Sequence, residues 1–295
     1  MSVIALTPDD FARLAAAYHA TRKLSRSTGI EAIGGTAEDR ALGFSAIWDA
    51  VRPRTLLDPF RGLVLARLLR RSADLAGDVI ECGAARGGGA ALLALAARSA
   101  GIGRRVFVAD RFDGLPEPDR RYDRSYRAGQ FASSRAEVGD FLAGLGLAES
   151  CPILDGDFAA TLPRLPPAQR FALVHLDGDL YASTATALAA LYPRVVPGGA
   201  VVFDDFYDGS GGVLAAAAEF LERSGELLFL GPTGQCRLVK GCRASEPQRR
   251  DRLLAETAAL GELPAYRAFL ASCLPLAEGE HRAAVAYLAA LAGAE

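Results

Sequence analysis

The chain lacks several features that mark common classes of protein. Its 295 residues contain no uninterrupted apolar run long enough to span a membrane. The first residues, MSVIALTPDD, have neither the basic start nor the apolar core of a secretion signal, so we expect a cytoplasmic protein. The formal net charge is only −2 and the pI is about 6.0, which provides no basic surface for nucleic acid or anionic lipid. We therefore expect a small-molecule partner, with no nucleic acid and no membrane.

Cysteine is scarce, and its distribution argues against two further classes. The five cysteines are odd in number and form no CxxC pair. A disulfide framework and a structural zinc site both need such pairs. We expect reduced thiols at all five positions, which are Cys82, Cys151, Cys236, Cys242 and Cys273.

The composition that is present, 51% hydrophobic and 23% charged, is that of an ordinary globular protein. Short strands rich in β-branched residues alternate with helices, a pattern that predicts a parallel sheet covered on both faces. The residues GPTG near the end of this pattern predict a closing antiparallel hairpin. We expect an N-terminal helical or lid segment over residues 1–70, a core over 71–243 and a C-terminal helical appendage over 244–295.

Individual elements follow from apolar periodicity and from helix and turn signals. Before the core we expect a helix over 11–20, a loop over 21–39, and two or three short helices over 44–69 broken by Pro53 and Pro59. The expected core strands cover 78–82, 105–110, 152–154, 171–176, 200–203, 227–230 and 236–240, and the expected core helices cover 88–99, 136–145, 182–192 and 212–222.

Two pairs of aspartates follow two of these strands. Asp177 and Asp179 come after FALVHL, and Asp204 and Asp205 come after AVVF. Because the carboxyl ends of parallel strands meet at one edge of the sheet, all four carboxylates should converge there. Like charges held together need protons or a cation, and hard oxygen ligands suit Mg²⁺. One isolated aspartate, such as Asp179, more often caps a helix, but two doublets favour a metal site.

Other residues near these strands allow two interpretations each. His175 could be a base, although a core histidine hydrogen-bonded to a neighbour is the better interpretation. Tyr181 either touches a cofactor or simply starts a helix. Trp48 and Tyr18 could cover a site, but aromatic core packing is favoured.

A glycine-rich turn, ECGAARGGG, joins the first core strand to its helix. Glycines there permit a tight turn and close approach of a ligand, although a turn that simply needs glycine is the plain alternative. The spacing matches neither GxGxxG nor GxxxxGK[ST]. Asp110 could accept hydrogen bonds from ribose hydroxyls, and Asp157 with Phe158 could hold an adenine. Ribose and adenine contacts without a phosphate grip suggest S-adenosylmethionine, and the residues expected to bind it are Glu81, Gly83, Gly87, Asp110, Gly156, Asp157 and Phe158.

Six segments, in this order, resemble the macrocin O-methyltransferase family of magnesium-dependent sugar O-methyltransferases from antibiotic biosynthesis. They are DVIECGAARGGGAALL, ADRFDGLPEPD, GDFAATLP, HLDGDLYAST, LYPRVVPGGAVVFDDF and GGVLAAAAEF, spread between about residues 45 and 240. The resemblance implies an α/β fold of the class I, Rossmann-like methyltransferase type: a doubly wound, mostly parallel seven-stranded sheet with an antiparallel last strand. It also implies a homo-oligomer.

The resemblance further implies roles for the aspartates. Asp179, Asp204 and Asp205 would hold Mg²⁺, which would chelate neighbouring hydroxyls of a sugar. Asp177 would act as the general base, and the resulting alkoxide would attack the methyl group of S-adenosylmethionine.

Departures from the family pattern leave the acceptor open. Arg111 stands where the family has a small polar residue, the closing hairpin lacks an aromatic-rich ending, and residues 241–295 fall outside the pattern. A deoxysugar on a natural product is the first choice, and a catechol-like or other vicinal diol is an alternative. A non-catalytic S-adenosylmethionine-binding protein and a metal-dependent hydrolase are alternatives of other classes.

Overall fold

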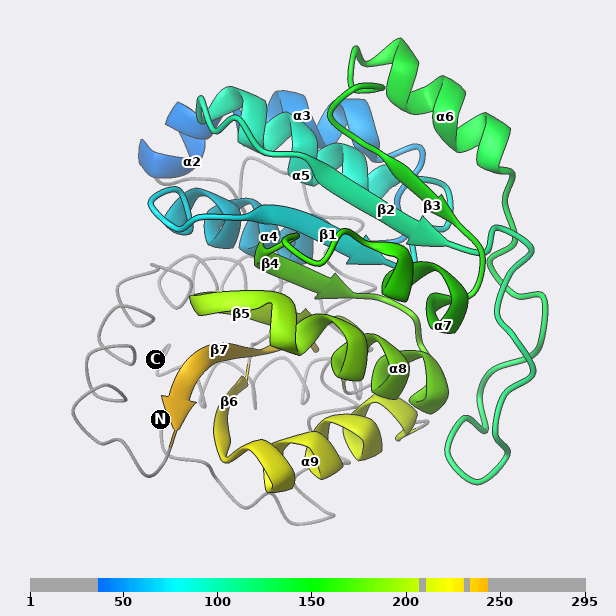
Figure 1. Cartoon of the computed structure of the whole chain (residues 1–295). Helices are drawn as coiled ribbons and strands as arrows, with labels where there is room; N and C mark the ends of the chain where they lie inside the picture. The colour runs from blue at the N-terminus through cyan, green and yellow to red at the C-terminus, as the bar shows by residue number, and fades with distance from the viewer. Residues whose placement is uncertain (1–36, 207–210, 231–233, 244–295) are drawn as a thin grey trace, which may run out of the picture.

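The computed structural model describes residues 37–206, 211–230 and 234–243, and within these ranges seven strands form one sheet (Figure 1). The strand order is β3-β2-β1-β4-β5-β7-β6. Strands β1 to β5 pair in parallel, whereas β7 runs antiparallel to both β5 and β6. The expected α/β sheet with an antiparallel last strand is therefore confirmed.

The strands are β1 (Asp78–Cys82), β2 (Val106–Asp110), β3 (Ile153–Asp155), β4 (Phe171–Leu176), β5 (Val195–Phe203), β6 (Glu226–Leu230) and β7 (Cys236–Arg243). The helices are α2 (Ala37–Leu42), α3 (Phe44–Val51), α4 (Pro59–Arg71), α5 (Gly88–Ser99), α6 (Arg135–Gly144), α7 (Phe158–Thr161), α8 (Tyr181–Leu191) and α9 (Gly212–Ser224), with 3₁₀ turns η2 (Leu162–Arg164) and η3 (Tyr192–Arg194).

Most expected elements lie within two residues of their observed bounds. Strand β7 ends at Arg243, three residues beyond the expected end, and the short helix α7 was not expected. Strand β5 begins at Val195, five residues earlier than expected, because Val195 pairs with Phe171 ahead of an irregularity in the register. Helix α2 replaces the end of the expected loop over 21–39. The expected helix over 11–20, Tyr18 and the appendage over 244–295 lie outside the described residues.

Helices cover both faces of the sheet, since alternate strand residues point to opposite sides (Figure 1). Val79 and Val108 pack with α3, α4 and α5 in one core. Ile80 and Val174 pack with α8 and α9 in the other. Trp48 belongs to the first core and is only 8% exposed, so its expected core packing is confirmed.

Helix α4 begins with strong local signals that fix its first turn. The Asp58 carboxylate accepts hydrogen bonds from the amides of Phe60 and Arg61, at 2.9 and 3.0 Å, and Pro59 occupies the first helical position. This cap directs the Arg61 side chain inward, where it is 1% exposed. The first turn of α4 thus delivers a buried cation to the carboxyl end of the sheet.

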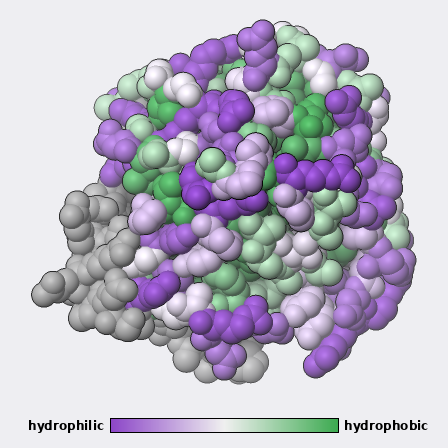
Figure 2. Space-filling view, viewed as in Figure 1, coloured by the Kyte–Doolittle hydropathy of each residue, from purple (hydrophilic) through white to green (hydrophobic). Residues whose placement is uncertain are grey.

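Hydrophilic side chains are spread over the face of the molecule drawn in Figure 2, with small hydrophobic areas between them. No helix in the described part of the chain combines the length and the apolar content that crossing a bilayer requires.

Candidate functional site

A cavity of about 430 Å³ opens at the carboxyl ends of the central strands. Its volume lies within the range of roughly 300–1,000 Å³ found for small-molecule sites. Ten of the eleven residues singled out from the sequence line it: Glu81, Gly83, Asp110, Gly156, Asp157, Phe158, Asp177, Asp179, Asp204 and Asp205. The eleventh, Gly87, does not line the cavity. It is the N-cap residue of α5 with φ 83°, and a Cβ there would lie 2.9 Å from Val138.

The glycines of the turn after β1 are required first by the protein's own packing. Gly83 has φ 94°, and a Cβ there would lie 1.9 Å from the carbonyl oxygen of Asp177. A Cβ on Gly89 would lie 2.0 Å from Oε1 of Glu81. Glycine therefore lets the chain after β1 approach the chain after β4, and lets α5 approach Glu81. Glu81 and Asp177 both line the cavity.

Asp110 shapes the glycine turn as well as facing the cavity. Its Oδ2 accepts hydrogen bonds from the amides of Ala84 and Ala85 at 2.7 and 2.8 Å, and its Oδ1 accepts one from Phe112 at 2.7 Å. A carboxylate can accept about four hydrogen bonds. One acceptor position on Asp110 therefore suits a ligand hydroxyl.

Arg111, the departure noted in the sequence, is paired with neighbouring acids. Its Nη2 lies 2.8 Å from Asp113 and its Nη1 lies 3.3 Å from Asp157. The hydrogen bond from Arg111 holds the pKa of Asp113 below its ordinary value. Beside Asp157, the ring of Phe158 packs over Gly178, where a Cβ would approach the ring to 3.2 Å.

The aspartates converge at the cavity, and their electrostatics show how crowded they are. Asp179, with φ 58°, shares a hydrogen bond with Asp205 that requires a proton on one of the two carboxyls. Burial, and then the charges of Asp205 and Asp177, raise the pKa of Asp179 well above its ordinary value. Burial also raises the pKa of Asp177 to about 7, although His175 opposes the rise. A cluster of this kind calls for positive charge.

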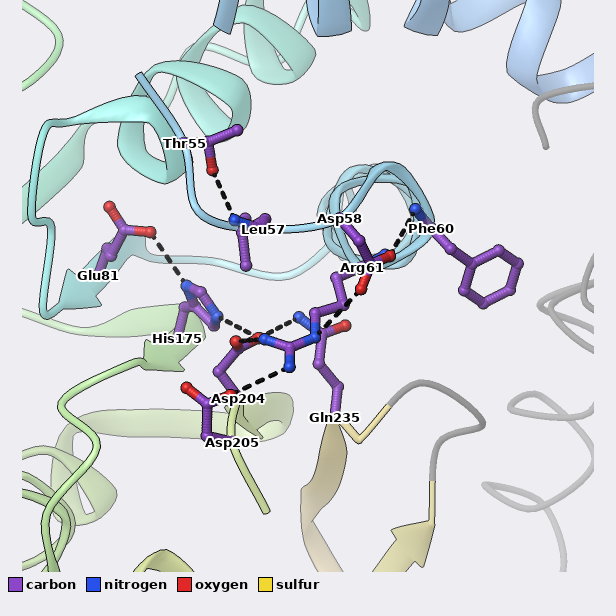
Figure 3. A network of polar contacts seen from close by, with 10 residues as sticks. All are labelled: Thr55, Leu57, Asp58, Phe60, Arg61, Glu81, His175, Asp204, Asp205 and Gln235. Atoms are coloured by element: carbon purple, nitrogen blue, oxygen red, sulfur yellow. Dashed lines mark hydrogen bonds and ion pairs between the residues drawn. The ribbon is translucent and has the colours of Figure 1, made fainter. Parts of the chain in front are cut away.

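Arg61 supplies one positive charge to this cluster (Figure 3). Its Nη2 lies 3.0 Å from Oδ1 of Asp205, its Nη1 bonds to Oδ2 of Asp204, and its Nε lies 3.4 Å from Oδ2 of Asp58. The sequence did not reveal this residue, because arginines in helices usually face solvent. Asp204 is 143 positions away along the chain, so no local pattern could indicate the pair.

His175 is fully buried and hydrogen-bonded on both sides, as Figure 3 shows. Its Nδ1 lies 3.1 Å from Oε1 of Glu81 and its Nε2 lies 3.4 Å from Oδ1 of Asp204. Burial alone lowers the pKa of His175, but Glu81 and Asp177 outweigh it and raise that pKa above its ordinary value. The interpretation of His175 as a hydrogen-bonded core histidine is confirmed. The other oxygen of Glu81, Oε2, is buried and has no hydrogen-bond partner within the described residues.

The donor set fits a divalent cation in chemistry, with one complication. One ligand atom from each of His175, Asp177 and Asp204 lies within 4.8 Å of the others, a trio that shares only Asp204 with the ligands expected from the sequence. Carboxylate oxygens are the ligands that Mg²⁺ prefers. Asp204, however, already accepts hydrogen bonds from Arg61, His175 and Gln235, the last at 2.6 Å. Gln235, like Arg61, was not identified from the sequence.

The loop between β2 and α6 covers one side of the cavity, and Tyr126 from this loop hydrogen-bonds to Asp179. The middle of the loop is fastened to the start of α8. Asp123 accepts a hydrogen bond from the Tyr181 amide at 2.9 Å, and the rings of Tyr122 and Tyr181 stack with centroids 4.2 Å apart. Tyr181 does not line the cavity, so it starts a helix and anchors the loop.

Comparison with known proteins gives a consistent picture. A family model described as "Macrocin-O-methyltransferase (TylF)" matches residues 65–225. Over 139 residues the chain is 40% identical to the 8-demethyl-8-(2,3-dimethoxy-alpha-L-rhamnosyl)-tetracenomycin-C 4'-O-methyltransferase of Streptomyces olivaceus, covering 44% of this chain and 53% of that protein. It is 36% identical over 142 residues to the demethyldecarbamoylnovobiocin O-methyltransferase of Streptomyces niveus, covering 45% and 54%. The chain thus spans about half the length of the curated relatives it matches.

Solved structures agree on the fold. The O-methyltransferase NovP superposes with a TM-score of 0.58 at 29% identity, over 63% of this chain and 81% of NovP. The calicheamicin methyltransferase CalS11 superposes with a TM-score of 0.55 at 22% identity, over 80% of this chain and 94% of CalS11. The second likeness bears on the fold alone, and both support the arrangement of class I methyltransferases.

Proposed function

Because this chain belongs to the macrocin O-methyltransferase family, we propose that it is an S-adenosylmethionine- and Mg²⁺-dependent O-methyltransferase. Its acceptor is a hydroxyl of a vicinal diol on a natural-product sugar. The observation that carries the proposal is the convergence of four carboxylates on one cavity, beside the glycine turn after β1. A protein that only bound a nucleoside would have no use for such a cluster.

The cofactor is held by the residues around the first three strand ends. Oε2 of Glu81 is a buried acceptor suited to the ammonium group of S-adenosylmethionine. The remaining acceptor position on Asp110 suits a ribose hydroxyl, and Phe158 offers a ring face near Asp157. Gly83 and Gly156 let the backbone approach the ligand, whereas Gly87 acts only through the turn.

Asp179, Asp204 and Asp205 would hold the metal, whose charge would lower the pKa of an acceptor hydroxyl beside it. Asp177 takes the proton of the acceptor hydroxyl, since its carboxylate lines the same cavity as the three metal ligands. The acceptor oxygen then bonds to the methyl carbon. The bond from that carbon to sulfur breaks, and its electron pair stays on the sulfur, giving S-adenosylhomocysteine. Tyr126 orients Asp179 by its hydrogen bond.

The cavity mouth supports an acceptor with an apolar part. Leu56 and Phe131 are the large hydrophobic residues that remain exposed in the described part of the chain, at 43% and 42%. Both line the cavity. An apolar aglycone would cover such side chains, as would the ring of a catechol-like acceptor, which is the second candidate. A homo-oligomer is part of the proposal and is tested by light scattering.

The first experiment is calorimetric titration with S-adenosylmethionine, with and without Mg²⁺, followed by assays on glycosylated natural products. Asp177→Asn should retain cofactor binding and lose turnover, because an amide cannot accept the proton. Asp113→Asn is the matched control, since this exposed carboxyl does not line the cavity. Full activity of Asp177→Asn would show that Asp177 is not the general base. Full activity in the presence of EDTA would show that the reaction needs no metal.

The two alternatives of other classes give different results in the same experiments. A metal-dependent hydrolase would be active without S-adenosylmethionine and would not bind it. A non-catalytic binding protein would bind the cofactor but turn over no acceptor, and its affinity would not depend on Mg²⁺.

A further inference from the structure

On the basis of the metal site proposed above, we propose that Arg61 competes with a divalent cation for Asp204 and Asp205. The residue would thereby set the metal affinity of the site. The guanidinium bonds directly to Oδ2 of Asp204 and to Oδ1 of Asp205 (Figure 3). These carboxylate oxygens are among those that a cation bound by the two aspartates would use.

Asp58 holds the Arg61 side chain in place, so the contact of Arg61 with Asp204 and Asp205 is not a chance orientation of a long side chain. Asp58 caps α4 through Oδ1, which accepts from the amides of Phe60 and Arg61. Its Oδ2 lies 3.4 Å from Nε of the same arginine. One aspartate thus starts the helix and orients the guanidinium, whose planar fork matches carboxylates.

The charges around Arg61 indicate that the arginine competes with a divalent cation but does not exclude it from the site. The guanidinium lies 2% exposed among three acids, and Asp177 and Asp179 crowd the same cavity. Arg61 and the proton between Asp179 and Asp205 together cannot neutralise five carboxyl groups, so the cluster still attracts a dication. Removing the guanidinium would release oxygens and remove a like charge from the cation's surroundings, and both effects tighten cation binding.

The test compares Arg61→Met with Arg67→Met in the full chain after treatment with EDTA. Arg67 is a matched control, because it lies on the same helix, is equally buried and pairs with Asp39 at 2.6 Å, outside the cavity. Binding of Mn²⁺ is measured by electron paramagnetic resonance, and binding of Mg²⁺ by calorimetry. Arg61→Met should bind Mn²⁺ more tightly than wild type by about tenfold or more, whereas Arg67→Met should match wild type.

Arg61→Lys keeps the charge but loses the fork, so its affinity should lie between wild type and Arg61→Met. It also serves if the methionine variant does not fold. Thermal unfolding adds a second readout: with EDTA, Arg61→Met should unfold at a lower temperature than wild type, and Mg²⁺ should raise its midpoint by more.

Unchanged or weaker Mn²⁺ binding by the Arg61 variants, in a protein whose wild type binds the ion, overturns the competition and leaves the proposed function standing. If neither wild type nor the variants bind a divalent ion, the competition and the metal-dependent function both fall. Binding by Arg61→Met alone supports competition and overturns the metal dependence of the proposed function for the wild type.

Discussion

Substitution of Gly83 by alanine should be among the most damaging small changes in this protein. The residue has φ 94°, and a Cβ would lie 1.9 Å from the carbonyl oxygen of Asp177 and 2.5 Å from its carbonyl carbon. Both atoms belong to the backbone, which cannot rotate away as a flexible side chain could. The ends of β1 and β4 must therefore separate, and Asp177 must move with them.

The loss of stability on substituting Gly83 has two parts, and the same substitution at a second glycine, Gly101, measures one of them alone. A left-handed backbone costs alanine roughly 1–2 kcal/mol, and overpacking a close-packed region costs about 1–3 kcal/mol more. Gly101 has φ 68° with nothing within 4 Å of an added Cβ, so Gly101→Ala should show the backbone cost alone. We expect a loss of roughly 2–5 kcal/mol of unfolding free energy for Gly83→Ala.

Denaturant unfolding of wild type and both variants measures this difference. A loss for Gly83→Ala no greater than that for Gly101→Ala would refute the close contact between β1 and β4. Catalytic assays add a check, since Gly83→Ala should lose activity at temperatures where it is still folded, whereas Gly101→Ala should not.

Three further predictions concern thiols, alkaline stability and the cavity mouth. Burial raises the pKa of Cys151 to about 11, and all four described cysteines are buried. In a Cys273→Ser variant, the native protein at pH 8 should therefore react with Ellman's reagent only after denaturation. Rapid labelling of four thiols in the native protein would contradict this. Burial and then the hydrogen bond to Glu226 raise the pKa of Tyr192 from 10.0 to about 12, so the folded state keeps this proton longer and stability falls as pH rises between those values. Tyr192→Phe should lack that part of the fall in unfolding free energy. If wild type and variant lost stability in parallel between these pH values, the prediction would be wrong. Phe131→Ser should raise KM for an apolar acceptor while leaving the affinity for S-adenosylmethionine unchanged. If the affinities for acceptor and cofactor fell equally, Phe131 would not be a contact specific to the acceptor.

The sequence predicted best what depends on neighbours along the chain. Strands β1 and β4 and the start of α5 were located from apolar runs bounded by glycine and acidic residues. The start of β5 was not, because Pro197 and Gly198 look like a turn until pairing with β4 extends the strand across them. Long-range pairing overrode a local signal there.

The same division holds for the candidate site. The strand-end aspartates are local features, and the sequence was sufficient to predict that they lie close together, as they do at one cavity. Arg61 and Gln235 are defined only by partners across the sheet, so no periodicity marks them. Asp110 combines the proposed ligand contact with three backbone hydrogen bonds, which only the folded turn reveals.

The loop between β2 and α6 has a practical consequence for redesign. Its ends meet, since the amide of Ser133 donates to the carbonyl of Phe112 at 2.8 Å, and its middle is pinned through Asp123. The loop is thus closed at its base and attached to the rest of the protein through Asp123, Tyr122 and Tyr126. Exchanging residues 113–132 with those of a relative, while keeping Tyr122, Asp123 and Tyr126, would replace one wall of the cavity without changing a strand of the sheet.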